Sequence, residues 1–257
     1  MRIEHFFDSS TSTFSYLVVD EGSGKAAIID SVLDYDAKSG RTSTAGAERI
    51  VARVRELGAR LELVLETHMH ADHLSAAPWL RERLGGKLAI GERITVVQKV
   101  FGKLFNASPG FALDGSWFDR LLHDGDRLEL GAIGIEAMHS PGHTPACMTY
   151  VLRCGAQTAA FVGDTLFMPD YGTARCDFPG GNALAYVSTV AEQRSANIHI
   201  HDGVSEDDFV AMRKQRDATL GMPVLILPSV QVNMRADELP APESNGICYL
   251  KILLDAV

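Results

Sequence analysis

The sequence predicts an α/β fold in which two β-sheets pack face to face and helices cover the outside. Short apolar segments typical of strands alternate with longer segments whose apolar residues recur at helical spacing. The strand-rich segments come in two groups, Thr13–Gly91 and Arg127–Val162, as expected for two sheets sharing one core. A chain of 257 residues suits one domain of this kind, and we assign residues 1–257 to a single domain.

The first group alternates strands with helices. The turn Glu21–Gly24 separates its first two strands, and Gly58 is placed to end its first helix. The predicted strands are Thr13–Asp20, Lys25–Asp30, Leu61–Glu66 and Leu88–Gly91. The predicted helices are Ala45–Leu57, Ala76–Leu84 and Ile94–Phe105.

The second group consists of strands bounded by Gly or Pro, and it is followed by a helical region. Its predicted strands are Arg127–Leu130, Ile133–His139, Cys147–Leu152 and Thr158–Val162. After them the pattern predicts helices over Ala183–Ala196 and Glu206–Leu220, and a short strand over Val224–Leu227.

Composition excludes several classes of partner. The net charge of −9 argues against a surface for nucleic acid or an anionic membrane, since both require clustered Lys and Arg. No apolar run approaches the roughly 20 residues of a membrane span, and the N-terminus has no apolar export segment. The four cysteines lack Cys-x-x-Cys spacing, which favours reduced thiols. We therefore expect a cytoplasmic protein.

The strongest motif is a cluster of four potential metal ligands between a predicted strand and a predicted helix. His68, His70, Asp72 and His73 lie within six residues, directly after the apolar strand Leu61–Glu66. Imidazole and carboxylate ligands together suit zinc or non-haem iron. A single histidine here would fit a polar turn equally well, but four such residues predict a metal site.

Two later turns can supply further ligands. His143 lies in the turn Ser140–Pro145, and Asp164 follows the strand Thr158–Val162. Taken alone, the first fits an ordinary turn and the second a helix N-cap. Following the histidine cluster in this order, both are predicted to bind the metal.

These motifs resemble the metallo-β-lactamase superfamily, which includes glyoxalase II, class B β-lactamases and persulfide dioxygenases. The resemblance covers nearly the whole chain and implies an αββα sandwich with its metals at one edge. Within the superfamily, three segments resemble bacterial persulfide dioxygenases and β-lactamase-like hydrolases. These segments are Leu65–Ala77, Gly163–Gly181 (GDTLFMPDYGTARCDFPGG) and Pro228–Arg235 (PSVQVNMR).

The resemblance implies one Fe(II) per chain, bound by His68, His143 and Asp164. It also implies oxidation of glutathione persulfide by O₂ to sulfite and glutathione. His70, Asp72 and His73 would then support the iron ligands or act as spare ligands. In two-metal relatives, the residue that matches Asp72 positions a hydroxide. Arg175 matches an arginine near the substrate and is expected to bind a substrate carboxylate, although a structural pairing with Asp177 is the competing interpretation.

The sequence departs from this family in one place. Relatives carry a further histidine in a His-Asp-Tyr motif, preceded by a helix and a strand, and this segment is absent after Ala183. The nearby run His199–Asp202 either replaces the missing ligand or has no metal role, and we favour the second interpretation. The loss favours a site for one metal.

The alternatives left open are a zinc or mixed-metal thioester hydrolase of glyoxalase II type, which would need two metals, and an inactive member that binds sulfur species. The alternative cofactor is zinc, with one or two ions per chain. The resemblance also brings in a rhodanese-type sulfurtransferase as a partner, and it leaves open a homodimer.

Overall fold

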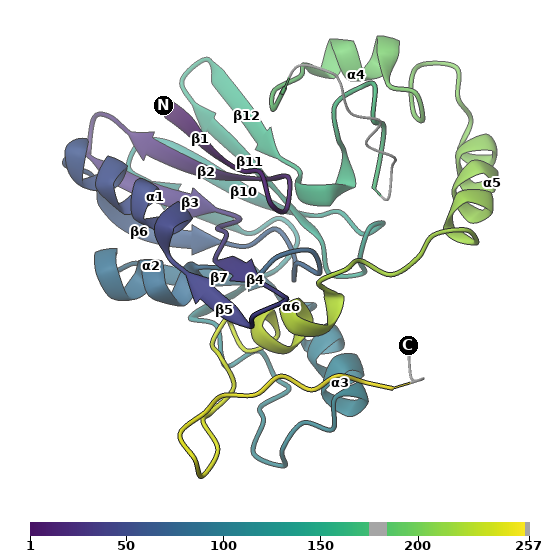
Figure 1. The fold of residues 1–257 in the computed structure, drawn as a ribbon. Coiled ribbons are helices and arrows are strands. Elements are labelled where there is room, and N and C mark those ends of the chain that lie inside the picture. The colour runs from purple at the N-terminus through teal and green to yellow at the C-terminus, as the bar shows by residue number, and fades with distance from the viewer. Residues whose placement is uncertain (175–183, 255–257) are drawn as a thin grey trace.

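Two β-sheets form the centre of the structure, a computed structural model that describes residues 1–174 and 184–254 (Figure 1). The first sheet has six strands in the order β1-β2-β3-β6-β7-β8. Strands β1 to β3 pair antiparallel, and β3, β6, β7 and β8 are parallel. The bounds are β1 Arg2–Asp8, β2 Thr13–Asp20, β3 Lys25–Ile29, β6 Arg60–Leu65, β7 Lys87–Gly91 and β8 Arg120–Leu122.

The second sheet is antiparallel, with four strands in the order β12-β11-β10-β9. Its strands are β9 Arg127–Leu130, β10 Ile133–His139, β11 Met148–Cys154 and β12 Gln157–Phe161. A separate hairpin of two strands, β4 Asp34–Asp36 and β5 Arg41–Ser43, precedes the first helix.

Alternate residues of the first sheet face two different cores. In β2 and β3, Val18 and Ile29 pack against the second sheet. Their neighbours Leu17 and Ile28 pack on the opposite face, against helices. Successive side chains of a strand point to opposite faces, so a sheet that is buried on both sides needs such continuous apolar strands. The predicted sandwich of two sheets with helices outside is confirmed.

Helices α1, α2, α3 and α6 contribute to the core on the outer face of the first sheet. Helices α4 and α5 lie on the opposite side of the molecule (Figure 1). The bounds are α1 Ala45–Glu56, α2 Ala77–Leu84, α3 Ile94–Leu104, α4 Val190–Ala196, α5 Glu206–Asp217 and α6 Ile226–Asn233, with a 3₁₀ turn η1 at Gly163–Thr165. Among the described residues, no helix is long and apolar enough to cross a membrane.

The expected strand Val224–Leu227 is wrong. Val224 is 93% exposed, and Ile226 begins α6 by donating its N–H to the carbonyl of Pro223. Pro228 lies in the first turn of this helix, where a backbone N–H is not needed. A short apolar run with one proline therefore formed a helix, an ambiguity that periodicity alone does not resolve.

The expected helix Ala183–Ala196 begins later than predicted. Residues 184–189 are not helical, and Ala183 lies outside the described residues. Thr189 accepts the N–H of Glu192, and the Glu192 carboxylate accepts the N–H of Thr189, forming a capping box. This reciprocal pair fixes the start of α4. The structure also adds β1, which the sequence pattern does not predict.

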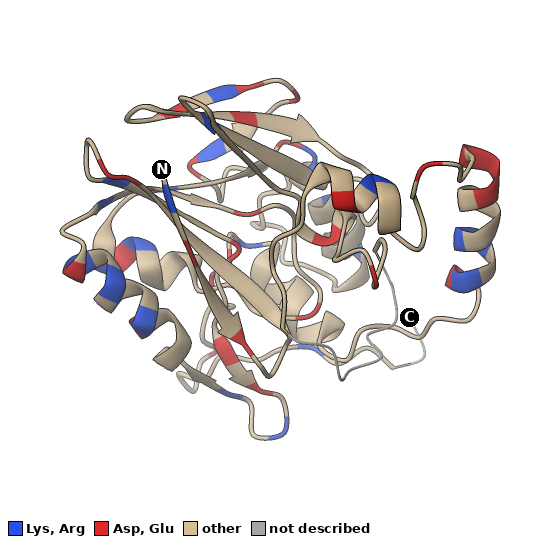
Figure 2. Cartoon of the chain, turned by 90° about the horizontal axis from the view of Figure 1, so that it is seen from above, with Lys and Arg blue, Asp and Glu red and all other residues tan. Residues whose placement is uncertain are grey.

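The segment from residue 184 to residue 225 contributes little to the hydrophobic core. None of the residues of α5 is buried against the described chain, and many of the exposed large apolar side chains lie after residue 183, including Val187, Val190 and Val224. The first turn of α5 is acidic and its last turn is basic, as Figure 2 shows for the helix at the right. Such a region opens at a lower free energy than the sheets do.

We expect limited proteolysis to cut first between residues 197 and 225, because few buried apolar contacts hold this segment. Mass spectrometry of the early fragments identifies the sites. A first cut inside β2, β3 or β6 would contradict this expectation.

Candidate metal centre

Three loops meet at one edge of the two sheets. The first follows β6 and carries residues 66–76, the second joins β10 to β11, and the third is η1 after β12. The N–H of Met148 donates to the carbonyl of Thr67 at 2.7 Å, and the hydroxyl of Tyr150 donates to the carbonyl of Glu66 at 2.8 Å. These bonds tie β11 to the loop after β6, so the two sheets hold the loops in register.

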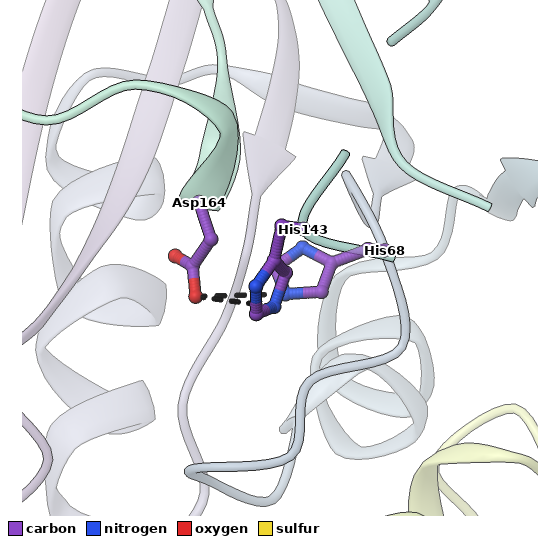
Figure 3. A group of neighbouring side chains, drawn as sticks. All are labelled: His68, His143 and Asp164. Carbon is purple, nitrogen blue, oxygen red and sulfur yellow. Dashed lines mark ion pairs between the residues drawn. The ribbon is translucent and has the colours of Figure 1, made fainter. Parts of the chain in front are cut away.

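His68, His143 and Asp164 come together as one group, as the sequence predicts. One ligand atom from each lies within 4.8 Å of the other two. Asp164 Oδ2 is 3.5 Å from His143 Nε2 and 3.9 Å from His68 Nε2, and both rings face the carboxylate (Figure 3). Burial raises the pKa of Asp164, and the nearby His143 opposes that shift. Two imidazoles and one carboxylate therefore converge from three separate loops.

The ring of His68 is oriented by Thr67 and Asp30. The Thr67 hydroxyl lies 2.9 Å from Asp30 Oδ2 and 3.0 Å from His68 Nδ1. Since the hydroxyl donates its one proton to the carboxylate, its oxygen accepts the Nδ1 proton of His68. Burial, and then the charges of His70 and His143, hold the pKa of His68 well below its usual range. The ring is therefore neutral, with the Nε2 lone pair facing Asp164.

Gly163 allows η1 to approach this histidine. Its φ of +51° lies in the left-handed region, and a Cβ there would be 2.5 Å from the Thr67 hydroxyl oxygen and 2.9 Å from Thr67 Cβ. A side chain would thus push Asp164 away from His68 or displace Thr67.

The donor set fits a transition metal. His68 Nε2 and His73 Nε2 are buried and make no hydrogen bond with the described part of the chain. Buried nitrogen atoms without a hydrogen-bond partner are unusual unless they bind a ligand or a metal ion. Zinc and iron sit about 2.0–2.2 Å from their nitrogen and oxygen ligands, so ligand atoms on one metal lie about 3 Å apart. The distances of 3.5 and 3.9 Å are close to this separation.

His70, Asp72 and His73 form a second group of the same kind, also within 4.8 Å. His73 Nδ1 lies 3.4 Å from Asp72 Oδ1, and the Thr13 hydroxyl lies 3.5 Å from Asp72 Oδ2. Burial raises the pKa of Asp72, but the hydrogen bond with His73 and the charges of His73 and His70 outweigh burial and lower it. The carboxylate is therefore ionised and available to a cation.

Two buried carboxylates hold the other side of His70. Its Nε2 lies 3.1 Å from both Asp30 Oδ1 and Glu66 Oε2. Burial by itself would lower the pKa of His70, but the charge and hydrogen bond of Asp30, followed by those of Glu66, outweigh it and raise the pKa well above its usual range. Because Nε2 faces these carboxylates, a metal could bind His70 only at Nδ1, after that nitrogen has lost its proton.

Sequence reasoning missed Asp30 and Glu66 as parts of the site. Asp30 follows β3, which is the parallel neighbour of β6, and the carboxyl ends of parallel strands meet at one edge of a sheet. That placement was the signal that could have found Asp30. The role of Gly163 depends on a contact with Thr67 that no local pattern reveals.

The run His199–Asp202 lies apart from both groups. The Thr173 backbone N–H donates to His199 Nδ1 at 3.0 Å, and His201 Nδ1 pairs with the carbonyl of Asp202. Neither histidine joins a group of potential metal ligands among the described residues. The interpretation of this run without a metal role stays a prediction. Arg175 and Asp177 lie outside the described residues, so the interpretation of Arg175 stays a prediction.

Asp237 carries a buried carboxyl group near Glu66 and Ser75 of the histidine loop. Its Oδ2 has no hydrogen-bond partner in the described chain, and burial, with the charge of Glu66, raises the pKa of Asp237 well above its usual range. In the unfolded chain, the pKa of an aspartate is about 3.9. Between that pH and its folded pKa the native state binds more protons than the unfolded state, so its contribution to stability is lost as pH rises through the folded pKa.

We therefore expect Asp237→Asn to gain stability relative to wild type as pH rises from 4 to 8, because asparagine does not ionise. Urea denaturation at several pH values measures the difference in the free energy of unfolding. A difference independent of pH would contradict the raised pKa of Asp237.

A family model of the metallo-β-lactamase superfamily matches residues 10–200. The chain therefore belongs to the metallo-β-lactamase superfamily, as its motifs predict. The predicted resemblance to the persulfide dioxygenase and glyoxalase branch is also confirmed, since relatives of both kinds are found.

Three relatives illustrate the branch. A protein of Burkholderia pseudomallei named as a probable metallo-hydrolase is 60% identical over all of both chains. A protein of Dictyostelium discoideum named glyoxylase B2 is 43% identical, over 99% of this chain and 97% of its own. The mitochondrial persulfide dioxygenase ETHE1 of Bos taurus is 30% identical, over 91% of this chain and 87% of its own. The crystal structure of ETHE1 from Myxococcus xanthus shares the fold, with a TM-score of 0.69 over 93% of this chain and 100% of that chain, at 24% identity.

The Burkholderia alignment extends over 294 residues, 37 more than the 257 of this chain, although it covers all of both. This chain therefore lacks residues that the relative has. The expected loss of a segment agrees with that difference, and its place after Ala183 stays a prediction.

Proposed function

We propose that this protein is a persulfide dioxygenase that uses one Fe(II) per chain. The reaction is glutathione persulfide plus O₂ and water giving glutathione, sulfite and two protons. The terminal sulfur loses four electrons and O₂ accepts them, so no other oxidant is required.

The observation that carries the proposal is the convergence of two imidazoles and one carboxylate, His68, His143 and Asp164, within 4.8 Å. Two histidines and one carboxylate are the ligand set of many non-haem iron oxygenases, in which three positions stay open. The relationship to the ETHE1 persulfide dioxygenase of Bos taurus supports the same reading. Bound there, Fe(II) would supply the positions at which the persulfide and O₂ meet.

The chain's own residues prepare this centre. Thr67 and Asp30 hold the His68 ring with its lone pair toward Asp164. His70, Asp72 and His73 support the adjoining side of the site. Asp72 is ionised and can orient a polar substrate group, and we propose that Arg175 binds a substrate carboxylate by charge-assisted hydrogen bonds.

A metal-dependent thioester hydrolase of glyoxalase II type is the second candidate. The group His70, Asp72 and His73 favours it, since a second metal there would create a two-metal site. The names of the Burkholderia and Dictyostelium relatives, probable metallo-hydrolase and glyoxylase B2, point the same way.

Elemental analysis and an oxygen electrode separate the two. We expect one iron per chain, O₂ uptake with glutathione persulfide, and sulfite as product. Two metals per chain with hydrolysis of S-lactoylglutathione and no O₂ uptake would establish the hydrolase instead. Iron-loaded protein with neither activity would indicate a binding protein.

A further inference from the structure

The side chain of Asn233 joins the C-terminal helix to the histidine loop. Asn233 is the last residue of α6 and is 2% exposed. Its Nδ2 donates to the carbonyl of His70 at 2.9 Å and to the carbonyl of His73 at 2.8 Å. Its Oδ1 accepts the N–H of Ser75 at 3.2 Å. Both donor hydrogens of the amide and its carbonyl oxygen are thus used on one turn.

These contacts replace a backbone ladder. Residues 66–76 lie between β6 and α2 and belong to no helix or strand, so their polar groups need other partners. Backbone hydrogen bonds hold this loop at Glu66, Thr67 and Leu74, which pair with Ala89, Met148 and Leu33. Asn233 satisfies three further backbone groups, two of which belong to potential metal ligands.

A second set of bonds makes the turn rigid from inside. The Ser75 hydroxyl donates to Glu66 Oε1 at 2.7 Å, and Glu66 Oε2 is 3.1 Å from His70 Nε2. The backbone of His70 is therefore held by Asn233 and its ring by Glu66 and Asp30. The His68 ring is held separately, by Thr67.

We propose that Asn233 is a positioning residue that fixes the backbone of His70 and His73, and so gives the His70–Asp72–His73 group its affinity for a divalent cation. The inference goes beyond the proposed oxidation, which depends on the His68–His143–Asp164 group. Asn233 in the C-terminal helix thus positions His70 and His73, whereas Thr67 positions His68.

The same helix provides a matched control. Gln231 is also a buried amide, 3% exposed, that makes three hydrogen bonds with its side chain. Its partners are the carbonyls of Leu227 and Lys251 and the N–H of Lys251, none of which lies in the histidine loop. Gln231→Ala removes an equivalent set of contacts from α6 without touching His70 or His73.

The test measures zinc affinity in full-length protein that carries His68→Ala, which disables the other group, by competition with a chromophoric chelator. Adding Asn233→Asp keeps the acceptor for Ser75 but turns an oxygen toward the two carbonyls. We expect zinc affinity to fall about 10- to 100-fold, the effect typical of residues that orient metal ligands. Adding Gln231→Ala is expected to leave it within about twofold, since it removes no such residue.

Equal affinity with and without Asn233→Asp, an equal loss with Gln231→Ala, or no zinc binding in His68→Ala protein would each overturn the proposal. A second measurement does not depend on His68→Ala. Hydrogen exchange of the Ser75 amide in otherwise unchanged protein should accelerate in Asn233→Ala and not in Gln231→Ala. Unchanged exchange in Asn233→Ala would also refute the assignment.

Discussion

Asp164→Ala is expected to remove nearly all bound iron from the protein. Asp164 supplies the only carboxylate of the group that it forms with His68 and His143, and its Oδ2 lies 3.9 and 3.5 Å from their Nε2 atoms. Without it, two imidazole nitrogen atoms remain as ligands, and the loss of affinity should exceed the ~10–100-fold that the loss of an orienting residue causes. His143→Ala should have the same effect. Inductively coupled plasma analysis after gel filtration measures the iron per chain.

His201→Ala is the control for this prediction. His201 is an exposed histidine whose ring Nδ1 lies 2.9 Å from the carbonyl oxygen of Asp202. Its iron content should equal that of the wild type. Iron close to one per chain in Asp164→Ala would show that the metal is held elsewhere, and loss of iron in His201→Ala would restore the view that this run replaces the missing ligand.

Gly163→Ala is expected to disturb both stability and metal binding. The new Cβ would lie 2.5 Å from the hydroxyl oxygen of Thr67, and the residue would keep a φ of +51°. Overpacking of this kind costs about 1–3 kcal/mol, and a left-handed backbone adds about 1 kcal/mol. Because Thr67 orients His68 and the next residue is Asp164, any relaxation displaces a ligand. Denaturant unfolding and iron analysis measure the two effects.

Gly155→Ala separates the steric effect from the backbone effect. Gly155 has a φ of +58°, but a Cβ there would meet no described atom within 4 Å. This variant should lose only about 1 kcal/mol of unfolding free energy, from the backbone strain. It should also retain its iron. If Gly163→Ala behaved in the same way, the close approach of η1 to Thr67 would not matter for the site.

The sequence predicted which potential ligands lie close together where those ligands form local motifs. His68, His143 and Asp164 each follow a strand or lie between two strands, and the structure brings them together as expected. The two sheets were also predictable, because Leu17 to Val19 and Ala26 to Ile29 are apolar at successive positions and must be buried on both faces.

The residues that orient the ligands could not be predicted in this way. Asn233 contacts carbonyls 160 and 163 residues earlier in the chain, and Asp30 reaches Thr67 from the end of the neighbouring strand β3. Neither contact leaves a periodic pattern in the sequence. Val224–Leu227 was predicted wrongly for a related reason, since a run of four apolar residues fits a strand or a helix end equally well.

A crystal structure of the iron-loaded protein, with anomalous scattering measured at the iron absorption edge, tests the central claim most directly. The account predicts one iron peak per chain, bounded by His68 Nε2, His143 Nε2 and an oxygen of Asp164. An iron peak bounded instead by His70, Asp72 and His73, with the first group empty, would contradict it.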